Sequence, residues 1–187
     1  MKNITTNIRI ALIAIAILGA SRIAQAYTPS QPLDIRVSIS ASKSLAVSTT
    51  YYNFGALAIN STNVSASSIT VTNDSGGLIE TYTIQGASAT AVTAGTDWGL
   101  AASTGTNQYA MDAQFSNPGS IQTAWTSDAL SFTATPCTAE VFGNTSGSES
   151  GLNVSPSGVR GLWFRIKTPS AVTDTAEHKA TITLAVQ

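Results

Sequence analysis

Residues 109–115 read Tyr-Ala-Met-Asp-Ala-Gln-Phe, and apolar side chains occupy every second position of this stretch. These alternate positions are Tyr109, Met111, Ala113 and Phe115. The intervening Asp112 and Gln114 are polar. Because successive side chains of a β-strand point to opposite faces of the sheet, a period of two predicts a strand with one apolar face.

The same period recurs along most of the chain. Six further segments alternate in this way: 35–39, 69–72, 81–85, 130–134, 162–167 and 181–186. Gly, Asn, Ser and Pro clusters separate them, and no helical 3.6-residue stripe is present between them. We therefore expect an all-β fold in which antiparallel sheets pack face to face, a β-sandwich of about 7–9 strands.

Two stretches of low complexity, 87–106 and 144–158, are expected to be surface loops. No linker divides the remaining chain, so we expect a single domain over residues 34–187. An extended N-terminal arm, residues 27–33, carries Pro29 and Pro32 and leads into it.

Residues 1–26 have the features of a signal peptide. Lys2 and Arg9 are basic, residues 10–20 are apolar, and Ala24-Gln25-Ala26 forms a small-x-small cleavage site. The apolar run is too short for a retained membrane span. We expect cleavage after Ala26 and export to the periplasm, the cell surface or the extracellular space.

Cleavage would remove Lys2, Arg9 and Arg22, which leaves six Lys and Arg against ten Asp and Glu and a net charge of −4. An acidic balance of this kind argues against a nucleic-acid partner or an anionic membrane. Ser and Thr make up more than a quarter of the mature chain, and such uncharged surfaces leave little repulsion to prevent sheets from associating.

Cys137 is the single cysteine, so the chain cannot form an internal disulfide. One interpretation is an intermolecular disulfide through Cys137. The other, which we favour, is a buried small apolar side chain, because free cysteine is among the most buried residue types.

Two parts of the chain resemble immunoglobulin-like domains of the abnormal-spindle/major-sperm-protein type. The opening of these domains is similar to Tyr52-Asn53-Phe54-Gly55, Ser61-Thr62 and Ser68-Ile69-Thr70-Val71-Thr72-Asn73. Their ending is similar to residues 154–158, the segment 162–166, Pro169 and the segment 180–186. Asn60 stands where the family has Gly, and the middle third has no counterpart. The resemblance implies an immunoglobulin-like β-sandwich; the whole chain also resembles exported bacterial proteins, which implies no activity.

The sequence offers little for catalysis or metal binding. His178, the only histidine, lies between Glu177 and Lys179 in what we interpret as a solvated turn. One His and one Cys cannot supply the ligands of a zinc or copper site, and no calcium-binding loop pattern occurs. We therefore expect neither an enzyme nor a cofactor.

The candidate contact site lies in the segment 162–167. If its apolar residues point into the core, then Trp163, Arg165 and Lys167 share the outer face. An aromatic ring beside two cations suits ligand stacking or a subunit contact. Equally, Arg165 could simply stack on Trp163 as a local cation–π pair.

Two functions follow from these patterns. The first is an exported, non-catalytic structural or surface-assembly protein, such as a fibre, matrix or surface-layer subunit or an adhesion module, in which residues 27–39 add a strand to a neighbour. Its partners would be other copies or cell-surface components. The alternative is a secreted carbohydrate-binding module that stacks glycans on Trp163, Trp98 or Trp125.

Overall fold

The computed structural model describes residues 35–38, 41–120, 124–143 and 149–187. The predicted signal peptide, residues 1–26, and the predicted arm, residues 27–33, lie outside the described residues. The chain divides into two compact units, Met1–Ile39 and Ser40–Gln187. The described part of the first unit, residues 35–38, has no regular secondary structure, and the eleven strands seen in the described residues all belong to the second unit.

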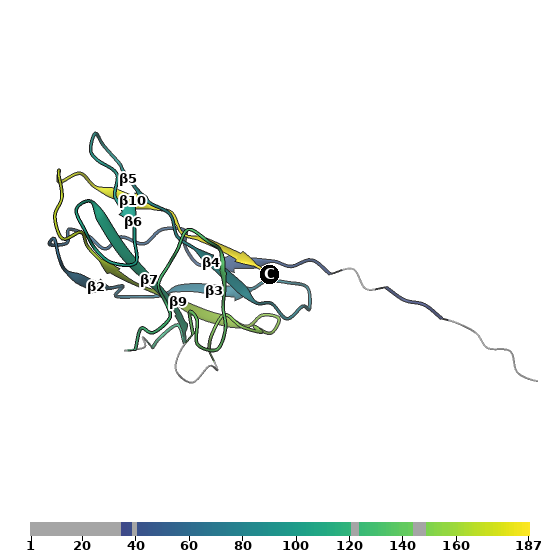
Figure 1. Ribbon diagram of the computed structural model, residues 1–187. Helices are drawn as coiled ribbons and strands as arrows, with labels where there is room; N and C mark the ends of the chain where they lie inside the picture. Colours follow the sequence, from purple (N-terminus) through teal and green to yellow (C-terminus); the bar gives the residue numbers. More distant parts are fainter. Residues whose placement is uncertain (1–34, 39–40, 121–123, 144–148) are drawn as a thin grey trace, which may run out of the picture. The chain divides into compact units, whose positions relative to one another are not determined.

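The largest sheet has the strand order β1–β3–β9–β7–β6, and β2 also pairs with β9 (Figure 1). Its members are β1 (Leu45–Val47), β2 (Thr62–Val64), β3 (Ile69–Asn73), β6 (Gly99–Leu100), β7 (Gln108–Ser116) and β9 (Val159–Lys167). The two nine-residue strands, β7 and β9, form its centre and pair antiparallel from Ala110↔Lys167 to Ser116↔Gly161. The β6–β7 pair is parallel, and the other pairs are antiparallel.

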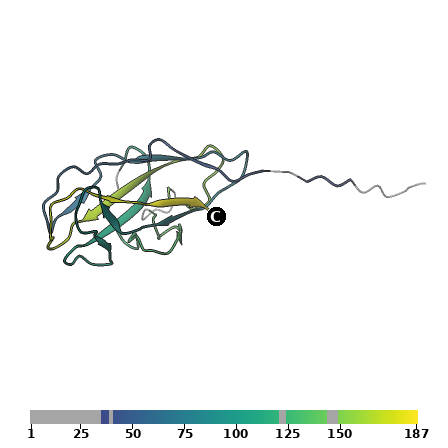
Figure 2. The same ribbon diagram turned by 90° about the horizontal axis from the view of Figure 1, so that it is seen from above.

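Two smaller sheets complete the described strands. One has the order β11–β4–β8 and the other pairs β10 with β5. Their members are β4 (Tyr82–Gln85), β5 (Ala89–Ala91), β8 (Thr135–Pro136), β10 (His178–Ala180) and β11 (Thr183–Val186). The last strand, β11, is seen in yellow as it runs to the C-terminus (Figure 2).

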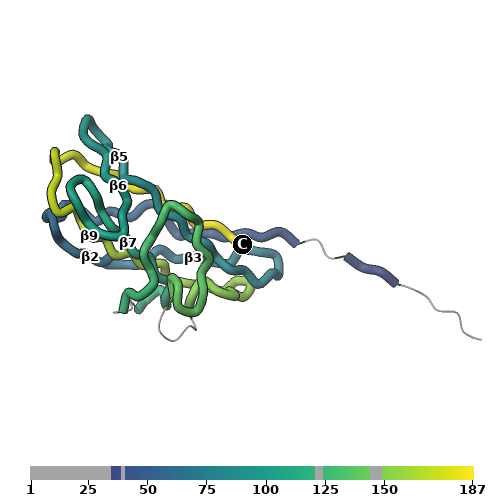
Figure 3. The backbone as a smooth tube through the Cα atoms, in the orientation of Figure 1, coloured from purple at the N-terminus to yellow at the C-terminus, as the bar shows by residue number. Residues whose placement is uncertain are grey.

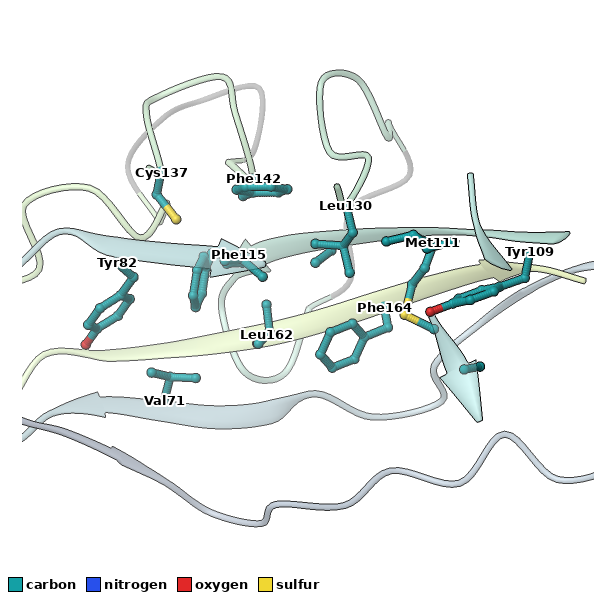
Figure 4. Packing of buried hydrophobic residues seen from close by; sticks show 14 of the residues in the cluster. Val71, Tyr82, Tyr109, Met111, Phe115, Leu130, Cys137, Phe142, Leu162 and Phe164 are labelled. Carbon is teal, nitrogen blue, oxygen red and sulfur yellow. The ribbon is translucent and has the colours of Figure 1, made fainter. Parts of the chain in front are cut away.

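The large sheet and the β11–β4–β8 sheet contribute to one hydrophobic cluster (Figure 4). Phe115 of β7 and Leu162 of β9 come from the first, and Tyr82 and Ile84 of β4 come from the second. Tyr82 and Phe115 are in tilted ring contact, with their centroids 5.5 Å apart. The alternation that predicts these strands therefore also predicts the side of each strand that faces the cluster.

Most of the predicted strands are confirmed. Segments 69–72, 81–85, 109–115, 162–167 and 181–186 correspond to β3, β4, β7, β9 and β11. The predicted loop 87–106 contains the short strands β5 and β6. Although most of their residues are small, they form strands because β5 pairs with β10 and β6 pairs with β7.

The strand predicted at 130–134 is wrong. Leu130 is buried beside β7, to whose Met111 carbonyl it donates a backbone hydrogen bond of 2.8 Å. The next carbonyl, that of Ser131, accepts a bond from Gly86, so the chain changes partner within one residue. Phe132 is consequently 56% exposed rather than part of a strand.

The described residues contain no helix and pair as strands in sheets, so this part of the chain is all-β. Accordingly, that part holds no helix with the length and apolar character needed to cross a membrane.

Candidate functional site

The predicted contact residues do share one face of the large sheet. Trp163 lies opposite Gln114, Arg165 opposite Asp112, and Lys167 opposite Ala110 in the antiparallel β7–β9 pair. In such pairs, directly opposed side chains project from the same face. The sequence therefore correctly predicts which residues of β9 are neighbours.

The prediction that this face is solvated is wrong at Trp163, which is only 6% exposed. Residues beyond the end of β7 cover it. Asn117 offers its carbonyl to Trp163 Nε1 at 3.5 Å, and Ala124 accepts a 2.8 Å bond from Gln114 Nε2. Figure 3 traces the described parts of this segment in green, and the bridge between Asp112 and Ala129 places Ala129 beside β7. Strand periodicity reports which face a residue occupies, but not whether a loop covers that face.

Asp112 is the charged centre of this face. Its Oδ2 atom lies 2.7 Å from Arg165 Nε and 3.6 Å from Lys167 Nζ, and its side chain is 9% exposed. One carboxylate thus holds Arg165 and Lys167, two of the three cations of β9, for which the sequence alone names no acidic partner. The signal was present in the alternation of β7, where Asp112 falls on the non-core face.

Arg165 also contacts an aromatic ring, but the ring belongs to Trp125 rather than Trp163. The guanidinium carbon lies 5.1 Å from the centre of the Trp125 ring. The sequence interpretation of a cation–π pair is thus correct for Arg165 and wrong in its aromatic partner, because the covering segment supplies a second tryptophan.

A second buried acid, Asp128, lies beside this network. Its Oδ2 atom accepts a 3.1 Å bond from Gln114 Nε2, and both side chains are almost fully buried. Burial, reinforced by the negative charge of Asp112, raises the pKa of Asp128 to about 7, although hydrogen bonds from Gln114 and the Phe142 backbone act in the opposite direction.

The same region contains polar atoms without partners. Within the described residues, neither Asp128 Oδ1 nor Gln114 Oε1 makes a hydrogen bond. Gln114 Nε2 by contrast has three acceptors, the carbonyls of Ala124 and Gly143 and the Asp128 carboxylate. The network therefore ties together the segments that cover the sheet, and it leaves two oxygens without a partner among the described residues.

His178 occupies a different position from the predicted solvated turn. It begins β10, and its ring stacks on Trp98 with centroids 3.9 Å apart and an interplanar angle of 16°. Its Nδ1 faces the Ala176 carbonyl at 2.7 Å and its Nε2 faces the Thr96 carbonyl at 2.9 Å. Both ring nitrogens thus face backbone carbonyl oxygens, and the ring packs on Trp98 next to the paired strands β5 and β10.

Each tryptophan ring is therefore either buried or in contact with another side chain. Trp163 is covered by the segment after β7, Trp125 lies against Arg165, and Trp98 lies against His178. The aromatic rings proposed as sugar platforms are thus at least partly occupied by the chain itself.

Cys137 lies in the hydrophobic cluster and is 1% exposed. Burial raises the pKa of its thiol to about 12. The buried interpretation of Cys137 is the one observed. An intermolecular disulfide would first require this part of the cluster to open.

The described residues bring together no three His, Cys, Asp or Glu side chains able to hold a metal ion. What the polar face can do is to neutralise Asp112, orient Arg165 and Lys167, and fix the covering segments.

Comparisons of the chain with models of protein families, with curated proteins and with solved structures gave no match.

Proposed function

We propose that the chain is an exported, non-catalytic structural subunit that assembles with other copies of itself at the cell surface or outside the cell. The observation that carries this proposal is a segment of alternating apolar and polar residues, 35–38, that precedes residues 40–187 in the sequence. Ile35 is 84% exposed and Val37 is 87% exposed, although both alternate with polar residues as strand residues do. Alternating apolar side chains left in water favour association with a second surface.

The second support is the form of the folded unit, which we infer to be an immunoglobulin-like β-sandwich. Two separate sheets supply Phe115 and Tyr82 to one cluster, as the two inner faces of a sandwich would. Such a fold presents sheet edges, and strand addition at an edge is a common route to assembly.

Export is the third element of the proposal, and it rests on the sequence of residues 1–26. We expect secreted protein to begin at Tyr27. N-terminal sequencing of the exported material tests this, and a chain that retains Met1 would contradict it.

The assembly itself is tested with mature protein, residues 27–187, by size-exclusion chromatography with light scattering and by negative-stain microscopy. We expect the wild-type chain to form concentration-dependent assemblies and the double variant Ile35→Ser, Val37→Ser to be monomeric with unchanged thermal unfolding. The matched control is Ile79→Ser with Val92→Ser, two exposed apolar side chains of the folded unit, which should assemble as wild type does.

Two results would overturn the proposal. One is a wild-type chain that stays monomeric at every concentration. The other is a double arm variant that assembles as well as the wild type. Binding to a glycan panel that is lost in Trp98→Ala or Trp125→Ala would instead support the carbohydrate-binding alternative.

A further inference from the structure

Several buried oxygens surround the side-chain amide of Gln114, on the polar face of β7. Gln114 Nε2 lies 2.8 Å from the Ala124 carbonyl oxygen and 3.1 Å from the Gly143 carbonyl oxygen. Its third neighbour is Asp128 Oδ2, also at 3.1 Å. An amide nitrogen carries two hydrogens, so it cannot donate one to each of three acceptors. This oxygen cluster therefore holds more acceptors than Gln114 can satisfy.

Two further oxygens of the same side chains have no partner. Gln114 and Asp128 are each 1% exposed, and within the described residues neither Gln114 Oε1 nor Asp128 Oδ1 forms a hydrogen bond. Each of them is bonded to the same carbon as an atom of the 3.1 Å contact. When Asp128 is ionised, both unpartnered atoms are acceptors. The group that completes the oxygen cluster must then bring positive charge or hydrogens to donate.

The charges around Asp128 favour a cation. Among the described residues its carboxylate forms no ion pair, and Arg165 and Lys167 both pair with Asp112 instead. Burial does most to raise the pKa of Asp128, and the charge of Asp112 raises it more than Arg165 lowers it. Both influences oppose a negative charge on Asp128, and a positive ion beside the carboxylate would relieve them.

The oxygen types select the kind of cation. Calcium binds carboxylate, side-chain amide and backbone carbonyl oxygens, and all three types are present in the oxygen cluster. Such a site does not need three acidic side chains, which the described residues do not bring together. Magnesium retains several waters and requires near-ideal octahedral geometry, so it is less suited to a buried set of protein oxygens.

We propose that the oxygen cluster, formed by Gln114, Asp128 and the carbonyls of Ala124 and Gly143, binds a calcium ion. The ion neutralises Asp128 and joins β7 to the segments that cover its polar face. The inference is independent of the proposed assembly, because it concerns a site within one chain. The ligands come from separate segments, so no local sequence motif marks them.

The first test asks whether calcium stabilises the folded chain. Mature protein, residues 27–187, is freed of metal with a chelator and unfolded by heat at pH 8, where Asp128 is mostly ionised. We expect about 10 mM calcium chloride to raise the melting temperature by about 3 °C or more over sodium chloride of equal ionic strength, since it binds the folded state. Magnesium chloride should raise it by less than half as much.

The opposite result of this first test is equally clear. If the oxygen cluster holds only a buried water, calcium chloride and sodium chloride will have the same effect on the melting temperature. That outcome would overturn the calcium site and leave the proposed assembly function untouched.

The second test removes the charge of the cluster and keeps its shape. Asp128→Asn should fold, because it takes an unpaired charge out of a buried position, and it should lose most of the calcium-dependent rise. Asp74→Asn, which removes an exposed acid, should keep the whole rise. A calcium response of Asp128→Asn equal to that of wild type would overturn the assignment, since the ion would then bind elsewhere.

The third test adds a ligand. Gln114→Glu replaces Nε2 by an oxygen that faces three acceptors, so this variant should melt below wild type in chelator. Calcium turns the new carboxylate into a ligand, and we expect it to raise the melting temperature of Gln114→Glu at least twice as much as that of wild type.

Circular dichroism keeps this third test decisive if Gln114→Glu is unfolded in chelator, because calcium should then restore the β-sheet signal of the folded chain. A Gln114→Glu chain that gains no more from calcium than wild type, or that calcium does not refold, would overturn the proposal.

Discussion

The two faces of β7 are equally buried but are built in different ways. On the cluster face, Met111 and Phe115 pack among apolar side chains contributed by other strands. On the other face, Asp112 and Gln114 are buried just as deeply, beneath the segments that follow the strand. One face is closed by apolar contact and the other by hydrogen bonds and ion pairs.

The difference matters because the two kinds of burial tolerate change differently. An apolar face loses stability in proportion to the volume that is removed. A polar face depends on each partner, since a buried charge or amide that loses its partner keeps the cost of its desolvation. The unpartnered Asp128 Oδ1 and Gln114 Oε1 show that this second face is incompletely satisfied within the described part of the chain.

The largest effect is expected on the cluster face. Phe115→Ala should lower the free energy of unfolding by about 4 kcal/mol, because it leaves a cavity beside Tyr82. Urea unfolding followed by circular dichroism measures it. Phe132→Ala, which removes a ring that is largely exposed, should change stability by less than about 0.5 kcal/mol. Similar losses in both variants would mean that the cluster is not packed around Phe115.

A smaller effect is expected from the ion pairs of the polar face. Asp112→Ala leaves Arg165 and Lys167 without their carboxylate and should cost about 2 kcal/mol. The double variant Asp112→Ala, Arg165→Ala should cost less than the sum of the two single changes, since the two residues are in contact. Additive costs would argue against the pair.

The smallest effect depends on pH and concerns Asp128. Its pKa is about 7 in the folded chain against an ordinary value of 3.8. Between about pH 4 and pH 7 the folded state therefore holds a proton that the unfolded chain has lost, so stability falls as the pH rises through this window and is level above it.

Asp128→Asn removes this titration. Relative to the variant, wild type should lose stability as the pH rises from 5 to 8. Thermal unfolding at a series of pH values measures the difference, and the exposed acid variant Asp74→Asn serves as the control. Parallel pH curves for wild type and Asp128→Asn would refute the role of Asp128.

The contrast between the two faces also explains what the sequence could predict. The period of two is a local property: in residues 109–115 it identifies β7 and its core face, and in residues 162–167 it places Arg165 and Lys167 on the same face as Trp163. The covering segment is held over this face by the carbonyls of Asn117, which faces Trp163 Nε1, and of Ala124, which accepts from Gln114, and both act through position rather than residue type. Nothing in their side chains could indicate this.

Partner choice over long separations is equally hidden in the sequence. The sequence indicates an aromatic partner for Arg165, but Asp112 and Trp125 are selected by strand register and by the path of a loop. The charged neighbours of His178 favour a turn, whereas its stacking on Trp98 depends on the pairing of β10 with β5.

Because Cys137 is buried, the rate at which its thiol is labelled can report local opening of the hydrophobic cluster. A thiol whose pKa is about 12 presents almost no thiolate to a labelling reagent at neutral pH while the cluster is closed. Modification of Cys137 should therefore proceed only through transient opening, at a rate that reports how often this end of the cluster exposes itself. Since the chain has no second cysteine, labelling adds mass at Cys137 alone. The time course of this mass increase would measure the rate of local opening around the Cys137 sulfur.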